Sequence, residues 1–324
     1  MFQRAGFDGF IIALLLMILL ARLWPEGSLE WKGFSISRLA GYGVSIIFFF
    51  YGLRLDPVKL KAGLQHWRLH LLVHLTTFGL FPFIAWATKW IFEGSLYYDL
   101  WLGFFFLSTL PSTVSSSVVM VSIARGNMAA AIFNASISSL IGVFITPLWM
   151  SLVMDSIGNT PALGDIIIKL VLQVLVPVIA GILLNKQLGY FAERNKKILK
   201  MFDQAVILLI VYTSFADSFL NKRFETLDLL TLVIMTFSMV VLFFVVFFII
   251  RYFCRLLNFN REDTIAAVFC GSKKSLVHGT VMSKVLFNAS PLTGIILLPL
   301  MIYHACQLLI ASILAKRFNE KASF

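Results

Sequence analysis

Apolar runs of about 20 residues recur along the whole chain, and each ends at a charged residue, a glycine or a proline. A single α-helix needs roughly 20 apolar residues to cross the hydrocarbon core of a bilayer. The pattern therefore predicts an all-α polytopic membrane protein with ten transmembrane helices. The expected spans are about 9–24, 36–53, 69–92, 100–124, 127–153, 165–188, 201–220, 227–253, 262–287 and 291–315.

Basic residues gather in alternate connections between these runs, whereas the other connections are richer in aspartate and glutamate. Lysine and arginine are enriched on the cytoplasmic side of membrane proteins, so the alternation predicts that both termini are cytoplasmic. Short loops and the lack of a soluble domain suit a bacterial inner membrane. The basic residues assigned to the cytoplasmic side are Arg54, Lys59, Lys61, Arg68, Arg125, Lys186, Arg194, Lys196, Lys197, Lys200, Arg251, Arg255, Arg261, Lys316, Arg317 and Lys321.

The ten expected spans divide into five and five at the loop Asp155–Asp165. We therefore expect two repeats, residues 1–154 and residues 155–324. Because each repeat has an odd number of spans, the second would sit in the membrane upside down relative to the first. The repeat is inferred from hydropathy and from the positions of polar interruptions, since the halves share little residue identity.

The fourth span of each half carries a polar interruption. In the first half, Pro111 breaks the helical pattern within a PSTVSSS segment that includes Ser115, Ser116 and Ser117. In the second half, the interruption is the sequence GSKKS at Gly271–Ser275. Matched interruptions in corresponding spans are typical of the midplane binding site of a secondary transporter. Non-helical backbone at that depth must face protein or a water-filled cavity.

Composition excludes an ordinary soluble protein, because 59% of the residues are hydrophobic and only 13% are charged. The net charge of +11 is explained by the loop lysines and arginines, so we expect no nucleic acid partner. The three cysteines form no spaced pair. The chain also lacks HExxH, GxSxG, a glycine-rich nucleotide loop and paired aspartates. An enzyme with a resident cofactor is therefore not expected.

Lys273 and Lys274 are the most unusual residues of the predicted spans. A lysine at mid-membrane depth costs about 2.5–3.5 kcal/mol on insertion scales, so such residues normally face a protein cavity. The end of the preceding half-helix carries partial negative charge, which favours a cation there. Ser275 follows directly, and His278 lies four residues after Lys274 on the same helix face, within reach of the same cavity. If the span is misplaced, the lysines would instead extend to the membrane surface.

Asn134 and Ser138 lie four residues apart in the fifth span, and therefore on one helix face. They either hydrogen-bond neighbouring helices or line an ion or substrate site. Together with Ser116 and Ser117, Asn134 is a candidate ligand of a weak sodium site. No acidic residue falls in the middle of a span, so a carboxylate ligand for sodium is missing.

Several segments resemble the bile acid:sodium symporter family of the solute carrier 10 type, in particular its seventh-member branch and bacterial relatives. The resemblance covers nearly the whole chain. It is carried by the FFFYGLRLDPVKL segment around Arg54, Gly126–Trp149, the YTSFADSF motif at Tyr212–Phe219, Asp263–Met282 and Pro299–Ser312. It implies two inverted five-helix repeats, a panel domain and a core domain, with broken helices 4 and 9 crossing in the core.

The resemblance also locates the sodium ligands of the sodium-coupled members. Their glutamate falls at Phe269, and their glutamine and asparagine fall at Lys273 and Lys274. Their serine–asparagine pair falls at about Ser116 and Ser117. The charged ligand is thus lost and two lysines are gained, so we hypothesise that a lysine acts as a tethered cation in place of sodium.

These observations predict a secondary active transporter that moves a small organic anion by alternating access. The coupling ion would be sodium or a proton, or transport would be uncoupled. The alternative is a regulatory membrane protein that affects ion homeostasis without carrying a solute. The expected partners are the lipid bilayer and the solute, and the expected oligomeric state is a monomer or a weak dimer.

Overall fold

The computed structural model describes residues 9–54, 66–154, 168–169, 171–225, 227–287 and 290–320. Within these ranges the chain is helical, and its only β feature is an isolated bridge between Trp31 and Phe34. The predicted boundary loop Asp155–Asp165 lies outside the described residues, as do the basic residues Lys59, Lys61 and Lys321. The division into repeats at residue 154 therefore stays a prediction.

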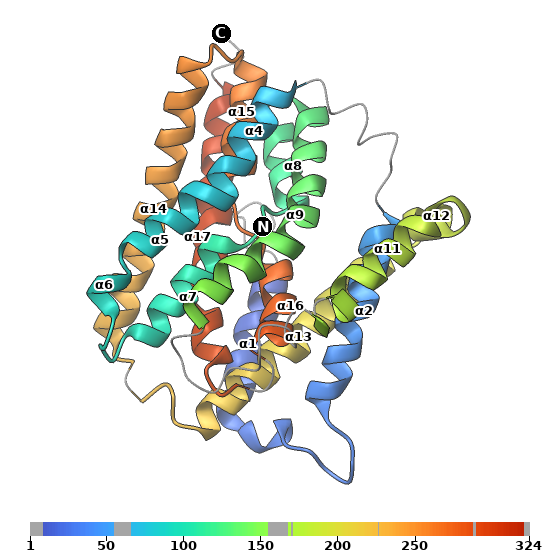
Figure 1. Cartoon of the computed structure of the whole chain (residues 1–324), viewed down its shortest axis with the longest axis vertical. Helices are drawn as coiled ribbons and strands as arrows, with labels where there is room; N and C mark the ends of the chain where they lie inside the picture. Colours follow the sequence, from blue (N-terminus) through green and yellow to red (C-terminus); the bar gives the residue numbers. More distant parts are fainter. Residues whose placement is uncertain are drawn as a thin grey trace.

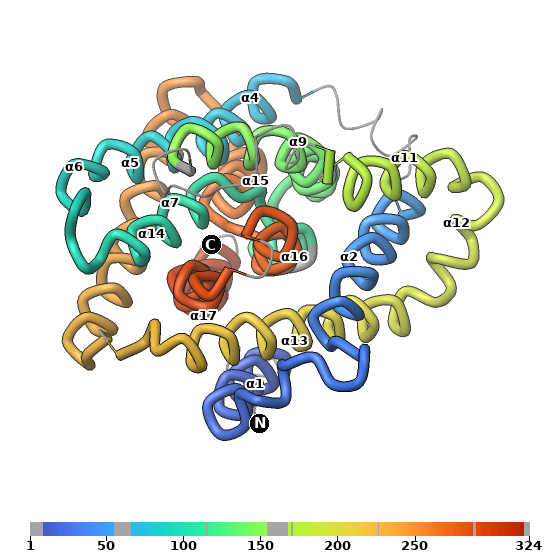
Figure 2. Tube along the Cα trace, turned by 60° about the horizontal axis from the view of Figure 1, so that its bottom comes forward, coloured from blue at the N-terminus to red at the C-terminus, as the bar shows by residue number. Residues whose placement is uncertain are grey.

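The helices form two groups that pack side by side (Figure 1, Figure 2). One group, here called the panel, lies as a layer along one side of the molecule, and the other group is here called the core. The panel contains α1 (Gly9–Leu23), η2 (Pro25–Ser28), α2 (Ile36–Leu53), η6 (Val171–Leu175), α11 (Val176–Leu183), α12 (Asn185–Arg194) and α13 (Lys196–Leu220). The core contains α4 (Trp67–Leu75), η4 (Thr76–Leu80), α5 (Phe81–Ala87), α6 (Lys89–Phe92), α7 (Tyr98–Thr109), α8 (Ser115–Ile123), α9 (Met128–Met154), α14 (Leu229–Leu256), α15 (Arg261–Gly271), α16 (Leu276–Leu286) and α17 (Thr293–Glu320).

The described chain is a polytopic membrane protein. Six helical segments are long and apolar enough to cross a bilayer, and a seventh span results if the pair Val171–Leu183 and Asn185–Arg194, bent by 98°, is counted once. Those six segments are Ile36–Leu53, Trp67–Phe92, Met128–Val153, Lys196–Leu220, Leu229–Leu256 and Thr293–Glu320. The other expected spans are either short, as is α1 with 15 residues, or split by an interruption. The count of ten therefore stays a prediction.

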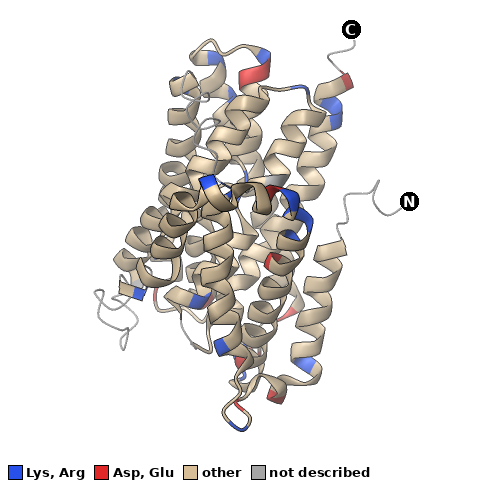
Figure 3. Cartoon of the chain, turned by 90° about the vertical axis from the view of Figure 1, so that its right-hand side faces the viewer, with Lys and Arg blue, Asp and Glu red and all other residues tan. Residues whose placement is uncertain are grey.

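The outer surface of the helices is apolar over long stretches. On α14, Val233, Phe237 and Phe248 are exposed by 56%, 68% and 59%, and they are spaced so that they lie on one side of the helix. Charged residues occupy only short segments of the helices (Figure 3). In water such a surface would be an aggregation liability, whereas in a bilayer it faces lipid tails.

Both predicted interruptions are present, and they contact each other. The first separates α7 from α8, and the second separates α15 from α16. The backbone N–H of Ser275 donates to the carbonyl of Pro111 over 2.9 Å, and the Ser112 hydroxyl donates to the carbonyl of Cys270 over 2.5 Å. The Ser112 N–H donates to the hydroxyl of Ser138 over 2.9 Å. Each break thus supplies partners for backbone groups that the other leaves outside a helix, which is required where water is scarce.

Close packing of α2 against α11 depends on two glycines. A methyl group at Gly52 would overlap the carbonyl oxygen of Val178, and one at Gly181 would overlap that of Phe49. Small residues let membrane helices approach until their backbones touch. The C-terminal half of α2 is therefore held firmly within the panel.

We expect Gly52→Ala to lower the free energy of unfolding by about 1–3 kcal/mol, the usual cost of overpacking. Thermal unfolding of the purified protein in detergent would measure the effect. Gly41→Ala is the matched control, because it lies on the same helix with nothing within 4 Å of the added methyl group. Equal melting temperatures for both variants would contradict the close packing of the panel helices.

Candidate functional site

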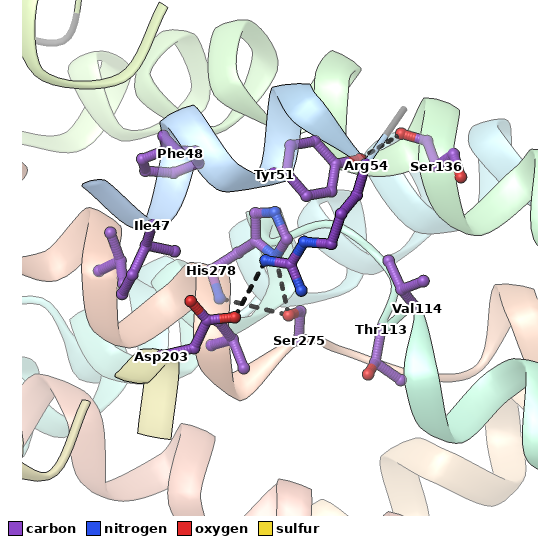
Figure 4. Close-up of a pocket in the computed structure, with 12 residues that line it drawn as sticks. Ile47, Phe48, Tyr51, Arg54, Thr113, Val114, Ser136, Asp203, Ser275 and His278 are labelled. Carbon is purple, nitrogen blue, oxygen red and sulfur yellow. Dashed lines mark hydrogen bonds and ion pairs between the residues drawn. The ribbon is translucent and has the colours of Figure 1, made fainter. Parts of the chain in front are cut away.

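A pocket of about 200 Å³ lies between the panel and the two interruptions of the core. The panel contributes side chains of α2 and α13, and the core contributes residues of the first interruption, α9 and α16 (Figure 4). Panel and core each contribute both apolar and polar side chains, so the pocket is amphipathic. It is lined by Ile47, Phe48, Tyr51, Arg54, Thr113, Val114, Ser136, Asp203, Ser275, Val277, His278 and Val281.

Arg54 is the cation of this pocket. It is the C-cap residue of α2, where the helix dipole favours positive charge, and its Nε donates to the carbonyl of Phe50 over 3.1 Å. One terminal nitrogen forms an ion pair of 3.1 Å with Asp203 of α13. A guanidinium group has five N–H donors, so Arg54 can bind an anion in the pocket while it keeps part of this arrangement.

His278 lies opposite Arg54, in the first turn of α16. Its Nδ1 is 3.0 Å from the hydroxyl of Ser275, which also caps the helix by accepting the backbone N–H of His278. The ring packs edge-on against Phe48 and Tyr51, with ring centroids 6.0 and 5.6 Å apart. Tyr51 in turn donates to the carbonyl of Ser136 over 2.8 Å. The histidine is therefore held where panel and core meet.

The side chain of Lys274 is completely buried and points away from this pocket, toward η4, α5 and α7. Its ammonium group donates to the carbonyls of Thr77, Ser108 and Leu110 over 2.7, 2.6 and 2.8 Å. The ring of Phe81 lies 4.2 Å away. A protonated lysine has three donors and no acceptor, so three carbonyl oxygens match its charged form. Two of them belong to the C-terminal end of α7, where the helix dipole is negative.

Gln307 of α17 fixes the backbone on which this lysine is mounted. Its side-chain carbonyl accepts the N–H of Lys274, and its amide donates to the carbonyl of Lys274, both over 2.8 Å. The exchange resembles the pairing of neighbouring strands, and it satisfies both polar groups of a residue that lies outside any helix.

Lys273 turns to the other side and contacts α8. Its ammonium group is 2.9 Å from the carbonyl oxygen and 3.4 Å from the hydroxyl of Ser116. The ring of Phe269 lies 5.9 Å away. The amino groups of the two neighbouring lysines thus lie at two separate points of the crossing region.

The residues predicted from the sequence fall into three sets. Ser275 and His278 line the pocket, whereas Lys273, Lys274 and Ser116 lie behind it. The expectation that the lysines and His278 reach one cavity is therefore not met by the described pocket, because the side chains diverge after the interruption.

The remaining predicted residues make structural contacts. The Ser117 hydroxyl donates to the carbonyl of Phe269 over 3.0 Å, and the Asn134 amide donates to the carbonyl of Ala130 on its own helix. Ser138 accepts the N–H of Ser112, as described above. Ser115 begins α8, and its side chain lies outside the described part.

Sequence reasoning missed Tyr51, Arg54, Asp203 and Gln307 as site residues. Arg54 was assigned to the cytoplasmic charge pattern and to a segment that carries the family resemblance, but not to a site. Asp203 lies near the end of an apolar run, where charge is ordinary. Only the packing of α2 beside α13 brings the two together. Gln307 did carry a signal, since a glutamine within an apolar run requires a buried partner.

Known proteins match the chain over nearly its whole length. The model of the SBF-like CPA transporter family matches residues 8–320. An uncharacterized protein of Pseudomonas aeruginosa is 40% identical over 97% of this chain and 93% of its own length. The putative symporter YfeH of Escherichia coli is 37% identical over 97% and 93%, respectively. The sodium/bile acid cotransporter 7-B of Xenopus laevis is 35% identical over 96% and 92%.

Proposed function

Since the chain belongs to the SBF-like CPA transporter family, we propose that it is a secondary transporter that moves a small organic anion through the pocket between panel and core. The observation that carries the proposal is the position of Arg54 in this pocket, opposite the interruption of the second broken helix. The names of two relatives, a putative symporter and a sodium/bile acid cotransporter, support transport as the activity.

The pocket sets the chemistry and the size of the solute. Its volume of about 200 Å³ lies below the roughly 300–1,000 Å³ of sites for drug-sized ligands. Arg54 supplies a partner for an anionic group, and Ile47, Val277 and Val281 supply apolar contact for a short hydrocarbon part. Oδ1 of Asp203 has no hydrogen-bond partner among the described residues. A hydroxyl or amino group on the solute would provide one.

Alternating access would arise from movement of the panel relative to the core. At the pocket, the two groups are joined by the hydrogen bond from Tyr51 to Ser136 and by the aromatic contacts of His278. These contacts can separate without unfolding a helix. A solute that binds both Arg54 of the panel and Ser275 or His278 of the core would stabilise one relative position of the two groups.

The lysines support coupling that does not use sodium. The amino group of Lys274 already occupies a site of three carbonyl oxygens, and Lys273 contacts the Ser116 oxygens that were expected to bind sodium. A sodium ion 4 Å from an ammonium group is repelled by about 4 kcal/mol at an effective dielectric of 20, which corresponds to roughly a thousandfold in affinity. Transport would then be uncoupled or driven by protons.

Two measurements test this function. Purified protein would first be screened by thermal unfolding against monocarboxylates from acetate to octanoate, hydroxy acids, and small organic phosphates and sulfates. A ligand at a hundred times its Kd stabilises by about 2.7 kcal/mol, which is readily seen. Uptake of the best stabiliser into proteoliposomes would then be followed in sodium chloride and in choline chloride.

We expect saturable uptake whose rate is the same in the two salts. A rate raised about tenfold by an inward sodium gradient would contradict the replacement of sodium by lysine. If no compound stabilises the protein and none is taken up, the transport proposal fails and the regulatory alternative gains support. Empty liposomes and liposomes with Arg54→Gln protein serve as controls.

A further inference from the structure

A second cavity, of about 510 Å³, opens between panel and core at the end of α2 that carries Ser35. We call it the vestibule. Its wall comes from the first half of α2, from η6 and from the end of α16. It is lined by Ser35, Ser37, Arg38, Gly41, Tyr42, Ser45, Gln173 and Lys284.

The vestibule is polar in a part of the molecule where a lipid-facing surface would be apolar. Ser35, Arg38, Tyr42 and Ser45 are spaced by three or four residues, so they lie on one face of α2. A face of hydroxyl and guanidinium groups on a membrane helix is typical of a water-filled cavity, because these groups are costly in lipid. The vestibule is therefore a solvated space rather than a gap for lipid tails.

Its charged lining residues are both basic, Arg38 and Lys284. The nearby carboxylates lie outside the lining. Glu30 pairs with Arg38 over 3.4 Å, but both side chains are more than half exposed, at 53% and 59%, so the pair is weak. Asp217 interacts electrostatically with Lys284 and is hydrogen-bonded by the hydroxyl of Ser28 over 3.2 Å. The cavity itself thus presents cations to whatever enters it.

The vestibule and the central pocket lie on the same two helices. Along α2, Ser45 of the vestibule precedes Ile47 of the pocket by two residues, and along α16, Lys284 follows Val281 by three. Three residues of α-helix rise by about 4.5 Å. The pocket residues nearest to the vestibule along these helices are the apolar Ile47, Phe48 and Val281, which are nearly completely buried, and we call them the apolar partition.

Lys284 also joins the core to the panel, because its ammonium group donates to the hydroxyl of Ser37 on α2. A carboxylate, phosphate or sulfate is a stronger partner for a partly buried ammonium group than a neutral hydroxyl, because it adds the attraction between opposite charges. An anion in the vestibule would therefore replace Ser37 as the partner of Lys284. This exchange would remove a contact that holds the panel against the core at this end.

From these observations we propose that the vestibule is a second anion-binding site, in which Lys284 and Arg38 bind the anionic group of the solute before it passes the apolar partition. The proposal rests on the proposed transport function, of which it names the entry site. A carboxylate, phosphate or sulfate group fits the two cations equally. Occupation would loosen the Lys284–Ser37 contact and so favour separation of panel and core.

Charge-selective labelling tests the vestibule without any need for transport. The reporter is Ser45→Cys in a Cys306→Ser background, since the other cysteines, Cys254 and Cys270, are buried. Two methanethiosulfonates of similar size would be compared, one with a sulfonate and one with a trimethylammonium group. Each rate would be normalised to the rate with a small free thiol, which removes the intrinsic difference between the reagents.

We expect the sulfonate reagent to react about tenfold faster than the cationic one, because a cavity lined by one sign of charge concentrates the opposite ion. Lys284→Gln should bring the ratio close to one, and Arg38→Gln should reduce it in part. Lys222→Gln is the matched control, since this lysine is 76% exposed and lies outside the lining, and it should leave the ratio unchanged. A ratio that Lys284→Gln does not alter would overturn the proposal.

The source of the anion is tested with lipid nanodiscs. In these nanodiscs, phosphatidylglycerol replaces phosphatidylcholine. If the labelling of Ser45→Cys remains anion-selective, the vestibule is still open to the anionic reagent, which supports a soluble anion as its occupant. If phosphatidylglycerol abolishes labelling, a lipid headgroup occupies the vestibule and the solute proposal is overturned.

In proteoliposomes, Lys284→Gln should raise the KM for uptake from the vestibule side about tenfold. If labelling remains anion-selective but the protein transports no solute, the proposed transport function is rejected and the anion-binding site in the vestibule is retained.

Discussion

Lys274→Met is expected to lower the free energy of unfolding by at least about 3 kcal/mol. Methionine has nearly the same length and fills the same space, but it donates no hydrogen bond. The carbonyls of Thr77, Ser108 and Leu110 would lose their common donor in the buried crossing region. Each buried acceptor left unsatisfied costs roughly 1–3 kcal/mol, which outweighs the benefit of removing a buried charge.

Thermal and denaturant unfolding in detergent would measure this loss, with Lys273→Met as the matched control. Lys273 is equally buried and lies next in sequence, yet its ammonium group contacts one carbonyl and one hydroxyl, both of Ser116. We therefore expect the control to lose clearly less stability. Equal losses would mean that the contribution of Lys274 to the free energy of unfolding comes from burial alone and not from its hydrogen bonds to three carbonyls.

A shorter variant, Lys274→Ala, tests whether the lysine replaces a bound cation. Removing the side chain leaves a cavity that faces three carbonyl oxygens and the ring of Phe81. Methylammonium carries three N–H donors, and sodium binds carbonyl oxygens, so either ion should raise the melting temperature of this variant. Choline has no N–H donor and should not. Wild-type protein should respond to none of the three, because its site is already filled.

The membrane class, the helical fold and both interruptions could be predicted because they depend on local sequence. A run of apolar residues must cross the bilayer as a helix, and Pro111 or the sequence GSKKS must break one. The bend of 98° after Leu183 was not predicted, because the polar residues Asn185–Gln187 were interpreted as the end of an apolar span and not as a turn within the panel. At the bend, the Asn185 amide donates to the carbonyl of Leu53 at the end of α2 over 2.7 Å, a contact that hydropathy does not reveal.

The candidate site could be predicted only in part, for a physical reason. Hydropathy identified the crossing region, because polar residues there are costly unless they face a cavity. Hydropathy does not say which way neighbouring side chains turn. Lys273, Lys274 and His278 lie within six residues, yet they point to α8, to α7 and into the pocket, respectively. The partners of Arg54 and His278 come from helices far apart in the chain, which periodicity does not place together.

Arg54→Gln is expected to raise the KM for uptake of the anionic solute about 30-fold or more. Hydrogen bonds to charged groups contribute roughly 1.5–3 kcal/mol, and a factor of ten corresponds to about 1.4 kcal/mol. The variant also leaves Asp203 without the cation that neutralises it at 3.1 Å, so the pocket would repel an anion. Concentration-dependent uptake into proteoliposomes would measure the change.

Two further variants separate the binding role of Arg54 from its structural role. Arg54→Lys keeps the charge and should lose less than the glutamine variant, although lysine cannot bind an anion with two parallel hydrogen bonds. Arg54→Gln combined with Asp203→Asn removes both charges of the pair and should recover part of the affinity, because the repulsion by Asp203 disappears. Full recovery in the double variant would show that Arg54 serves only to neutralise Asp203. Partial recovery, with the KM still raised, would show that the guanidinium group binds the solute directly.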